Sequence, residues 1–243
     1  MSFAGQTVLV TGGASGFGLA IARKFSGRDA QLVIADINRE LGEKVIQDMD
    51  ESRFIHCDVS NSESVDALFS QLENIDVLIN NAGITHTPAP AEDISEDDFD
   101  QVFAVNAKSV FLTCRNAIPM MKAVGHGIIL NIASTAGVSP RPNLAWYNAS
   151  KGWMITATKS LAVELAPFNI RVNAINPVAG ETPLLSTFMG GDTPSLRENF
   201  LKTIPLGRFS QPEDIASAAC FLCSSEASMI TGIAMEVDGG RCI

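Results

Sequence analysis

The chain of 243 residues is 46% hydrophobic and 18% charged, which excludes a disordered protein and leaves room for one large domain or two small ones. A formal net charge of −10 argues against nucleic-acid binding and against docking to anionic membranes or acidic partners. No apolar run reaches the roughly 18 residues of a membrane span, and the first residues lack a signal-peptide pattern, so we expect a cytoplasmic protein.

Short apolar runs alternate with amphipathic stretches from one end of the chain to the other. Strands that are apolar throughout are buried on both faces, so this alternation predicts a parallel sheet covered by helices on both sides, in one α/β domain over residues 1–243. The expected strands are 7–10, 31–35, 53–57, 77–80, 127–132, 170–174 and 233–237. The expected helices are 16–27, 39–50, 61–73, 96–124, 147–166 and 212–224, with N-caps at Asn38, at Ser60 or Asn61, and at Ser95.

The five cysteines are scattered along the sequence, and their odd number does not indicate a disulfide framework. Cys220 and Cys223 have the C-x-x-C spacing of a metal or redox site, but they lie in an apolar helical stretch with no second pair and no histidine nearby. We therefore expect two small buried helix residues here, and no metal site in the chain.

A glycine-rich loop follows the first expected strand and leads into the first expected helix. Its sequence is Thr-Gly-Gly-Ala-Ser-Gly-Phe-Gly over residues 11–18. Glycines let the backbone turn sharply and approach a pyrophosphate, and the helix N-terminus adds its positive end. The loop therefore predicts a dinucleotide phosphate site made by Gly12, Ser15, Gly16, Phe17 and Gly18.

An acidic residue, Asp36, closes the second expected strand 18 residues after Gly18. A carboxylate at this position can accept the hydroxyls of the adenosine ribose and would repel a 2′-phosphate, which favours NAD over NADP. The alternative is that Asp36 is a carboxylate in the N-cap region of the next helix. Arg39 is close enough in sequence to keep NADP as an alternative cofactor. After the third strand, Asp58 could accept the adenine amino group.

The only tyrosine of the chain, Tyr147, lies four residues before Lys151. On a helix this spacing places both side chains on one face. An ammonium beside a phenol stabilises the phenolate, so we expect a lowered tyrosine pKa and a phenol that can exchange a proton with an alcohol oxygen. The alternative is a buried tyrosine beside an ordinary surface lysine.

Together these motifs resemble those of the short-chain dehydrogenase/reductase family along essentially the whole chain. The resemblance implies a single-domain, Rossmann-like, doubly wound parallel sheet, and an NAD(H)-dependent oxidoreductase that interconverts a small secondary alcohol and its ketone. Its residues are the glycine-rich loop from Thr11 to Gly18, Asp58, the Asn-Asn-Ala-Gly run at 80–83, Asn106, Ser134 and Tyr147-x-x-x-Lys151, with Ser134 standing 13 residues before Tyr147.

The resemblance also implies a role for each catalytic residue. Tyr147 would be the general acid or base, and Lys151 would lower its pKa and bind the nicotinamide ribose. Ser134 would hydrogen-bond the substrate oxygen, and Asn106 would hold a water that links Lys151 to solvent. The cofactor site would further include Val59, Asn81, Ala82, Gly83, Pro177, Gly180 and Thr182.

One segment departs from the family pattern. The family commonly has Pro-Gly-x-Ile/Val-x-Thr after the sixth strand, whereas residues 177–182 here read Pro-Val-Ala-Gly-Glu-Thr. Pro177 and Thr182 match, but Val178 and Gly180 do not, so the resemblance does not fix the backbone near the nicotinamide. The next residues, 183–205, are rich in proline, glycine and apolar side chains, and we expect a mobile lid over a pocket.

For the substrate we expect a polyol, a sugar alcohol, a cyclic alcohol or a hydroxyketone, bound near Ser134, Tyr147, Trp146 and Leu184. Arg141 would bind an anionic substrate group or face solvent. A 3-oxoacyl-thioester reductase is the alternative, although the negative net charge disfavours docking of an acidic carrier protein. A non-catalytic nucleotide-binding regulator is an alternative of a different class. The family further implies a homotetramer, or a dimer.

Overall fold

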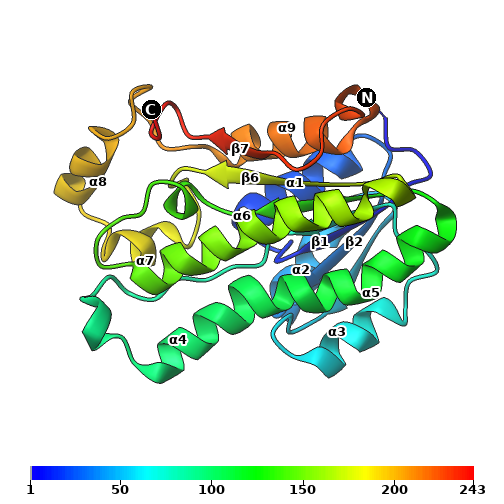
Figure 1. Cartoon of the computed structure of the whole chain (residues 1–243), viewed down its shortest axis with the longest axis horizontal. Coiled ribbons are helices and arrows are strands. Elements are labelled where there is room, and N and C mark those ends of the chain that lie inside the picture. The colour runs from blue at the N-terminus through cyan, green and yellow to red at the C-terminus, as the bar shows by residue number, and fades with distance from the viewer. Residues whose placement is uncertain (1) are drawn as a thin grey trace.

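The fold is described from a computed structural model that covers residues 2–243 (Figure 1). Its centre is one sheet of seven parallel strands in the order β3-β2-β1-β4-β5-β6-β7. The strand order reverses between β1 and β4, and in such sheets ligands bind outside the carboxyl ends of the strands at that point. The strands are β1 Thr7–Thr11, β2 Gln31–Asp36, β3 Ser52–His56, β4 Val77–Asn80, β5 Gly127–Ile132, β6 Ile170–Pro177 and β7 Ala234–Val237.

Helices cover both faces of the sheet. One face carries α3, α5 and α6, and the other carries α1, α2 and α9. Within β1 the side chains alternate between these layers, since Leu9 packs with α5 and Val8 and Val10 pack with α1. The helices are α1 Gly16–Ser26, α2 Arg39–Val45, α3 Ser62–Phe69, α4 Glu96–Phe103, α5 Ser109–Val124, α6 Ala145–Leu165, α7 Leu185–Met189, α8 Pro194–Leu201 and α9 Pro212–Cys223.

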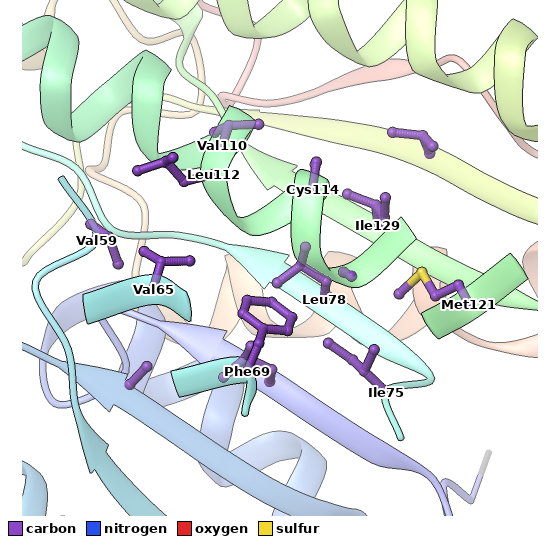
Figure 2. Packing of buried hydrophobic residues seen from close by; sticks show 14 of the residues in the cluster. Val59, Val65, Phe69, Ile75, Leu78, Val110, Leu112, Cys114, Met121 and Ile129 are labelled. Carbon is purple, nitrogen blue, oxygen red and sulfur yellow. The ribbon is translucent and has the colours of Figure 1, made fainter. Parts of the chain in front are cut away.

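The core under α3 and α5 is shown in Figure 2. Phe69 of α3 lies between the two layers, beside Leu78 of β4 and Ile75 just before that strand. Met121 of α5 packs over Gly127 at the start of β5, where a Cβ atom would lie 2.6 Å from the methionine Cγ. Each fully buried side chain of this size contributes about 1.5–3 kcal/mol of transfer free energy.

A buried polar network ties this core to the carboxyl ends of the central strands. The Asn80 amide donates to Asn131 at 2.9 Å and accepts from Thr113 at 2.7 Å. Asn131 in turn donates to Thr158 of α6 at 2.9 Å. Because buried amides are costly to leave unpaired, these bonds fix how α5 and α6 sit on β4 and β5.

Most of the predicted elements are confirmed, with differences in their boundaries. α2 and α3 end at Val45 and Phe69, before the predicted ends at residues 50 and 73. β6 extends to Pro177, beyond the predicted end at residue 174, because the sheet buries the whole strand. The expected helix 96–124 is interrupted by a π-helical turn, η3, at Ala104–Lys108. The predicted N-caps are confirmed at Asn38, Asn61 and Ser95, whose side chains each accept a main-chain N–H in the first turn.

The segment between β6 and α9 contains α7 and α8, which lie beyond the carboxyl end of β6 (Figure 1). It has a small apolar core of its own, formed by Val178, Leu185, Met189, Phe200, Ile204 and Phe209. Cys220 and Cys223 are unpaired and buried in α9, as predicted. Among residues 2–243, no helix has the length and apolar character needed to cross a membrane.

Candidate active site

A cavity lies at the carboxyl ends of β4, β5 and β6, with α7 on its open side. Of the predicted catalytic residues, Ser134, Tyr147 and Lys151 line it together. Its wall is mainly apolar and comes from segments far apart in the sequence. The remaining lining residues are Phe17, Asn81, Gly83, Ile84, Ile132, Ala133, Pro177, Val178, Ala179, Gly180, Thr182, Leu184, Leu185 and Phe188.

The first turns of α6 carry Tyr147 and Lys151 into this cavity. The helix begins at Ala145, so the two residues lie one turn apart on one face, as their spacing predicts. Both side chains are buried, with exposed fractions of 5% and 4%. The alternative of a surface lysine is therefore wrong.

The electrostatic relation between these two residues differs from the prediction. Burial raises the pKa of the Tyr147 phenol, and a hydrogen bond from the Ser134 side chain opposes this rise. Burial also lowers the pKa of the Lys151 ammonium to about 8. The expected lowering of the phenol pKa by the lysine is not found, because desolvation outweighs other effects at both groups.

Ser134 lies two residues after the end of β5 and faces the phenol. Its hydroxyl accepts a hydrogen bond from the main-chain N–H of Ala136 at 3.1 Å, which caps the short turn η4, Thr135–Gly137. This contact orients the hydroxyl beside Tyr147. An oxygen bound to the carbon undergoing reaction could therefore meet two hydroxyl groups at this point of the cavity.

A larger groove adjoins the cavity, with a volume of about 530 Å³. The lining residues that it shares with the cavity are Phe17, Asn81, Gly83, Ile84, Thr182 and Leu184. At its far end stands Asp36, whose carboxylate accepts main-chain N–H groups from Ala14 at 3.0 Å and Asn38 at 2.9 Å. The groove also holds Gly12, Ser15, Gly16, Phe17, Asp58, Val59, Ala82 and Leu184.

The glycine-rich wall of this groove is suited to a dinucleotide. Gly12 has a φ of +61°, and a Cβ atom there would lie 2.9 Å from the Cα of Ala82, so only glycine allows the loop to pass this close. Gly18, which was also predicted to bind the cofactor, is not among the residues that line the groove. A Cβ atom there would strike the carbonyl of Gly12. It therefore serves the close packing of helix on strand.

Comparison with known proteins agrees with this arrangement. A family model described as enoyl-(acyl carrier protein) reductase matches residues 12–241. The 4-formylbenzenesulfonate dehydrogenase TsaC1/TsaC2 of Comamonas testosteroni is 47% identical, over 97% of this chain and 97% of its own length. The chain belongs to the short-chain dehydrogenase/reductase family. It is an oxidoreductase with the Rossmann-like fold of that family.

Two further members of the short-chain dehydrogenase/reductase family illustrate the range of relatives. A cyclopentanol dehydrogenase of a Comamonas species is 38% identical, over 97% of this chain and 96% of its own length. A crystal structure described as a 3-ketoacyl-(acyl-carrier-protein) reductase from Brucella melitensis complexed with NADH has a TM-score of 0.94 and is 47% identical, with 100% of both chains covered.

The fourth predicted catalytic residue, Asn106, lies in the π-helical turn η3 and is completely buried. Its amide donates to the Ile84 carbonyl at 2.9 Å and to the Ser150 hydroxyl at 3.0 Å, and its oxygen accepts the Ile84 N–H at 2.9 Å. It therefore fixes the loop after β4 against α6. A Cβ atom on Gly83 would lie 3.3 Å from the Lys151 Nζ and 3.4 Å from the Asn106 Oδ1, so the two polar groups meet at this glycine.

The departure from the family pattern at residue 180 has a structural explanation. A Cβ atom on Gly180 would strike the ring of Phe17 and lie 2.7 Å from the Ser210 hydroxyl. Phe17 belongs to the glycine-rich loop, so the glycine makes room for an aromatic ring that lines both the cavity and the groove. Val178 is buried in the apolar core beneath α7 and α8.

Two residues predicted to bind substrate do not line the cavity. Trp146 is next to Tyr147 in sequence but points to another side of α6, where it packs edge-on against Phe99 and donates to the Ala91 carbonyl at 3.2 Å. Arg141 lines a neighbouring cavity behind α7.

The cavity also contains a residue that the sequence did not single out as a substrate contact. Phe188 of α7 lies edge-on to Tyr147, with 5.6 Å between the ring centres. In the sequence, the signal that could have identified Phe188 was the apolar composition of the expected lid, residues 183–205.

Proposed function

We propose that this protein is an NAD(H)-dependent oxidoreductase that interconverts a small secondary alcohol and its ketone, with Tyr147 as the general acid or base. The observation that carries this proposal is the convergence of Ser134, Tyr147 and Lys151 in one cavity, which adjoins the groove lined by the glycine-rich loop and Asp36. The cofactor would supply a hydride acceptor or donor at the nicotinamide carbon.

The residues of the chain would divide the remaining work. Ser134 would donate a hydrogen bond to the substrate oxygen and stabilise the negative charge that develops on it. Tyr147 would take the hydroxyl proton during oxidation and return it during reduction. Lys151, whose pKa burial lowers to about 8, would hold its ammonium toward the ribose. It would also exchange protons with a water bound by Asn106.

The groove supports a preference for NAD. The Asp36 carboxylate lines the groove where the adenosine ribose would lie, and its two oxygens each accept a main-chain N–H group. A 2′-phosphate at this place would meet a negative charge. In the related Brucella crystal structure, the bound cofactor is NADH.

The relatives support an alcohol or aldehyde of modest size as the substrate. Their names include a cyclopentanol dehydrogenase and a 4-formylbenzenesulfonate dehydrogenase, both of which act on ring compounds. The cavity wall, with Ile84, Val178 and Leu185 among its members, is suited to such an apolar ring.

A 3-oxoacyl-thioester reductase is the second candidate, because the family model and the Brucella structure both carry acyl-carrier-protein reductase descriptions. The net charge of −10 is unfavourable for docking an acidic carrier protein, which ranks this candidate lower.

Assembly as a homotetramer, or as a dimer, also belongs to this proposal. Large apolar side chains are exposed on α5 and α6, among them Phe111, Val124, Trp153 and Val163. Light scattering at micromolar concentration would test it, and a monomeric mass would refute it.

The central experiment compares the wild-type protein with Tyr147→Phe on a panel of polyols, cyclic alcohols, aryl ketones and oxoacyl thioesters, with NAD(H) and NADP(H). We expect Tyr147→Phe to lower kcat by about 10²–10⁴-fold, the range of general acid–base catalysis, while NADH binding measured by fluorescence is retained. Full activity of the variant would refute the mechanism. NADH binding by the wild type without turnover of any compound would favour a regulator.

A further inference from the structure

Arg141 occupies an unusual environment behind the lid. It lies in the loop between η4 and α6, where its main-chain carbonyl accepts a hydrogen bond from the buried Asn148 amide at 2.8 Å. Its guanidinium lies over the rings of Phe200 at 4.3 Å and Phe188 at 5.1 Å. The loop and the two rings therefore hold the cation in one place.

This cation has no anionic partner in the part of the chain that the structure describes. The Nη1 atom of Arg141 is buried without a hydrogen-bond partner, and Arg141 takes part in no ion pair among residues 2–243. The charge nearby is a second cation, Arg241, and burial together with this like charge lowers the pKa of Arg141. Two cations held together without a counter-charge are costly, so their arrangement indicates a missing anion.

The two arginines face the same small cavity, which has a volume of about 140 Å³. Asn199 and Thr203 of the α8 region add polar groups to its wall, and Met189, Leu196 and Phe200 make the rest apolar. No carboxylate lines it. Planar guanidinium groups with an amide and a hydroxyl match the oxygens of a carboxylate or sulfonate.

The side chain of Phe188 lies between a residue of this cavity, Arg141, and a residue of the active-site cavity, Tyr147. Phe188 lies with its ring centre 5.6 Å from that of Tyr147, and the same ring is 5.1 Å from the guanidinium carbon of Arg141. Phe188 belongs to the five-residue helix α7, which ends at Gly190 and Gly191 with positive φ angles of 75° and 139°. A shift of this short helix would therefore join the two cavities.

We propose that Arg141 and Arg241 form an anion subsite of the active site, which binds a carboxylate or sulfonate carried by the substrate on the side away from its reacting carbon. This proposal rests on the proposed function. A ring compound with its carbonyl beside Ser134 and Tyr147 would pass Phe188 and place its anionic group between the arginines. The subsite selects aryl or cyclic substrates with a negative group over neutral ones.

Kinetics with two ketones that differ only in charge test this selectivity. We expect kcat/KM of the wild type, with NADH, to be at least tenfold higher for 4-acetylbenzoate than for acetophenone. In Arg141→Met this ratio should fall at least tenfold, mainly through KM for the anionic ketone, and Arg141→Lys should retain part of it because the charge remains. Arg53→Met is the matched control, since Arg53 lies on β3 at the opposite edge of the sheet and its loss should leave the ratio unchanged.

Binding measured without turnover provides an independent readout. Calorimetric titration of the NAD-loaded protein with benzenesulfonate should give saturable binding that Arg141→Met and Arg241→Met each weaken at least tenfold. Inorganic sulfate should bind at least tenfold more weakly, because it lacks the ring that reaches the reacting centre. Equal binding of sulfate and benzenesulfonate would overturn the assignment of the anion to the substrate.

The outcomes separate this proposal from the proposed function. Equal turnover of both ketones by the wild type would overturn the subsite and leave the proposed function intact. Failure to reduce either ketone would count against the proposed function. Benzenesulfonate binding that is unaffected by the arginine variants would overturn the subsite whatever the activity.

Discussion

The Lys151 ammonium donates a hydrogen bond to the main-chain carbonyl of Ile132 at 3.0 Å. Ile132 is the last residue of β5, two positions before Ser134. The carbonyl thus holds the lysine between the strand end and α6, whereas the Tyr147 phenol faces Ser134 and the lid. One helical turn brings lysine and tyrosine to the same cavity, but their nearest partners come from other elements.

The buried lysine should make the protein less stable at neutral pH than it would be without this charge. The Lys151 pKa of about 8 lies below the ordinary 10.5, so the unfolded chain binds the proton more tightly than the folded one. We expect Lys151→Met to raise the free energy of unfolding at pH 7 by about 1–3 kcal/mol. This is less than the free energy that corresponds to the whole pKa shift, because the hydrogen bond to Ile132 is lost. Urea unfolding of both proteins checks this value.

The extra stability of Lys151→Met over the wild type should decrease as the pH rises. The penalty of burying Lys151 is complete below pH 8, where both states carry the proton. It declines between pH 8 and 10.5, where the folded lysine has released its proton and the unfolded lysine still keeps it, and it is gone above pH 10.5. The stability difference between variant and wild type should therefore shrink over this window. Lys159→Met, an exposed lysine on the same helix, should show neither the gain nor the trend.

Ser134 should affect both the rate and its pH profile. Ser134→Ala removes the hydroxyl that would stabilise the substrate oxygen, so we expect kcat to fall by about 10²–10³-fold. The hydrogen bond from Ser134 lowers the Tyr147 pKa, so its loss should move the rising limb of the oxidation rate to higher pH. Initial rates between pH 6 and pH 11 measure both effects. Ser160→Ala, exposed on α6, is the control, and an unshifted profile in Ser134→Ala would contradict the assignment.

The cofactor preference should depend on Asp36. In Asp36→Asn the side chain keeps an oxygen for one of its two main-chain donors but loses the charge that repels a 2′-phosphate. We expect the ratio of kcat/KM with NAD to that with NADP to fall at least about tenfold, equivalent to about 1.4 kcal/mol. The exposed Asp50→Asn should leave the ratio unchanged. If the wild type prefers NADP, the proposed preference for NAD is wrong.

The packing of Phe17 against Gly180 should make residue 180 intolerant of a methyl group. Gly180→Ala places a Cβ against the Phe17 ring and 2.7 Å from the Ser210 hydroxyl, so we expect a loss of about 1–3 kcal/mol of stability and weaker NADH binding. The matched control is Gly152→Ala in α6, where the nearest atom, the Gly137 carbonyl oxygen, would lie 3.7 Å away. That change should raise stability by up to about 1 kcal/mol. Thermal melts and NADH titrations compare the two, and equal effects would contradict the packing argument.

Much of the fold was predictable because it depends on short-range patterns. Apolar runs and caps such as Asn38 and Asn61 located the strands and the starts of helices to within a few residues. The stretch predicted as one helix across 96–124 is helical throughout, but the pattern did not indicate its π-helical turn, where Asn106 bonds to Ile84 and Ser150, which are distant in sequence. The end of β6 likewise depended on its neighbour β7.

The sequence by itself determined the order of the elements and brought Tyr147 and Lys151 to one helix face, because helical and strand periodicity are local properties. Only the tertiary structure decided what each side chain meets. Burial set the direction of the tyrosine and lysine pKa values, and the lid placed Phe188 between Tyr147 and Arg141. These outcomes depend on desolvation and on contacts between residues far apart in the chain, which no spacing within one element encodes.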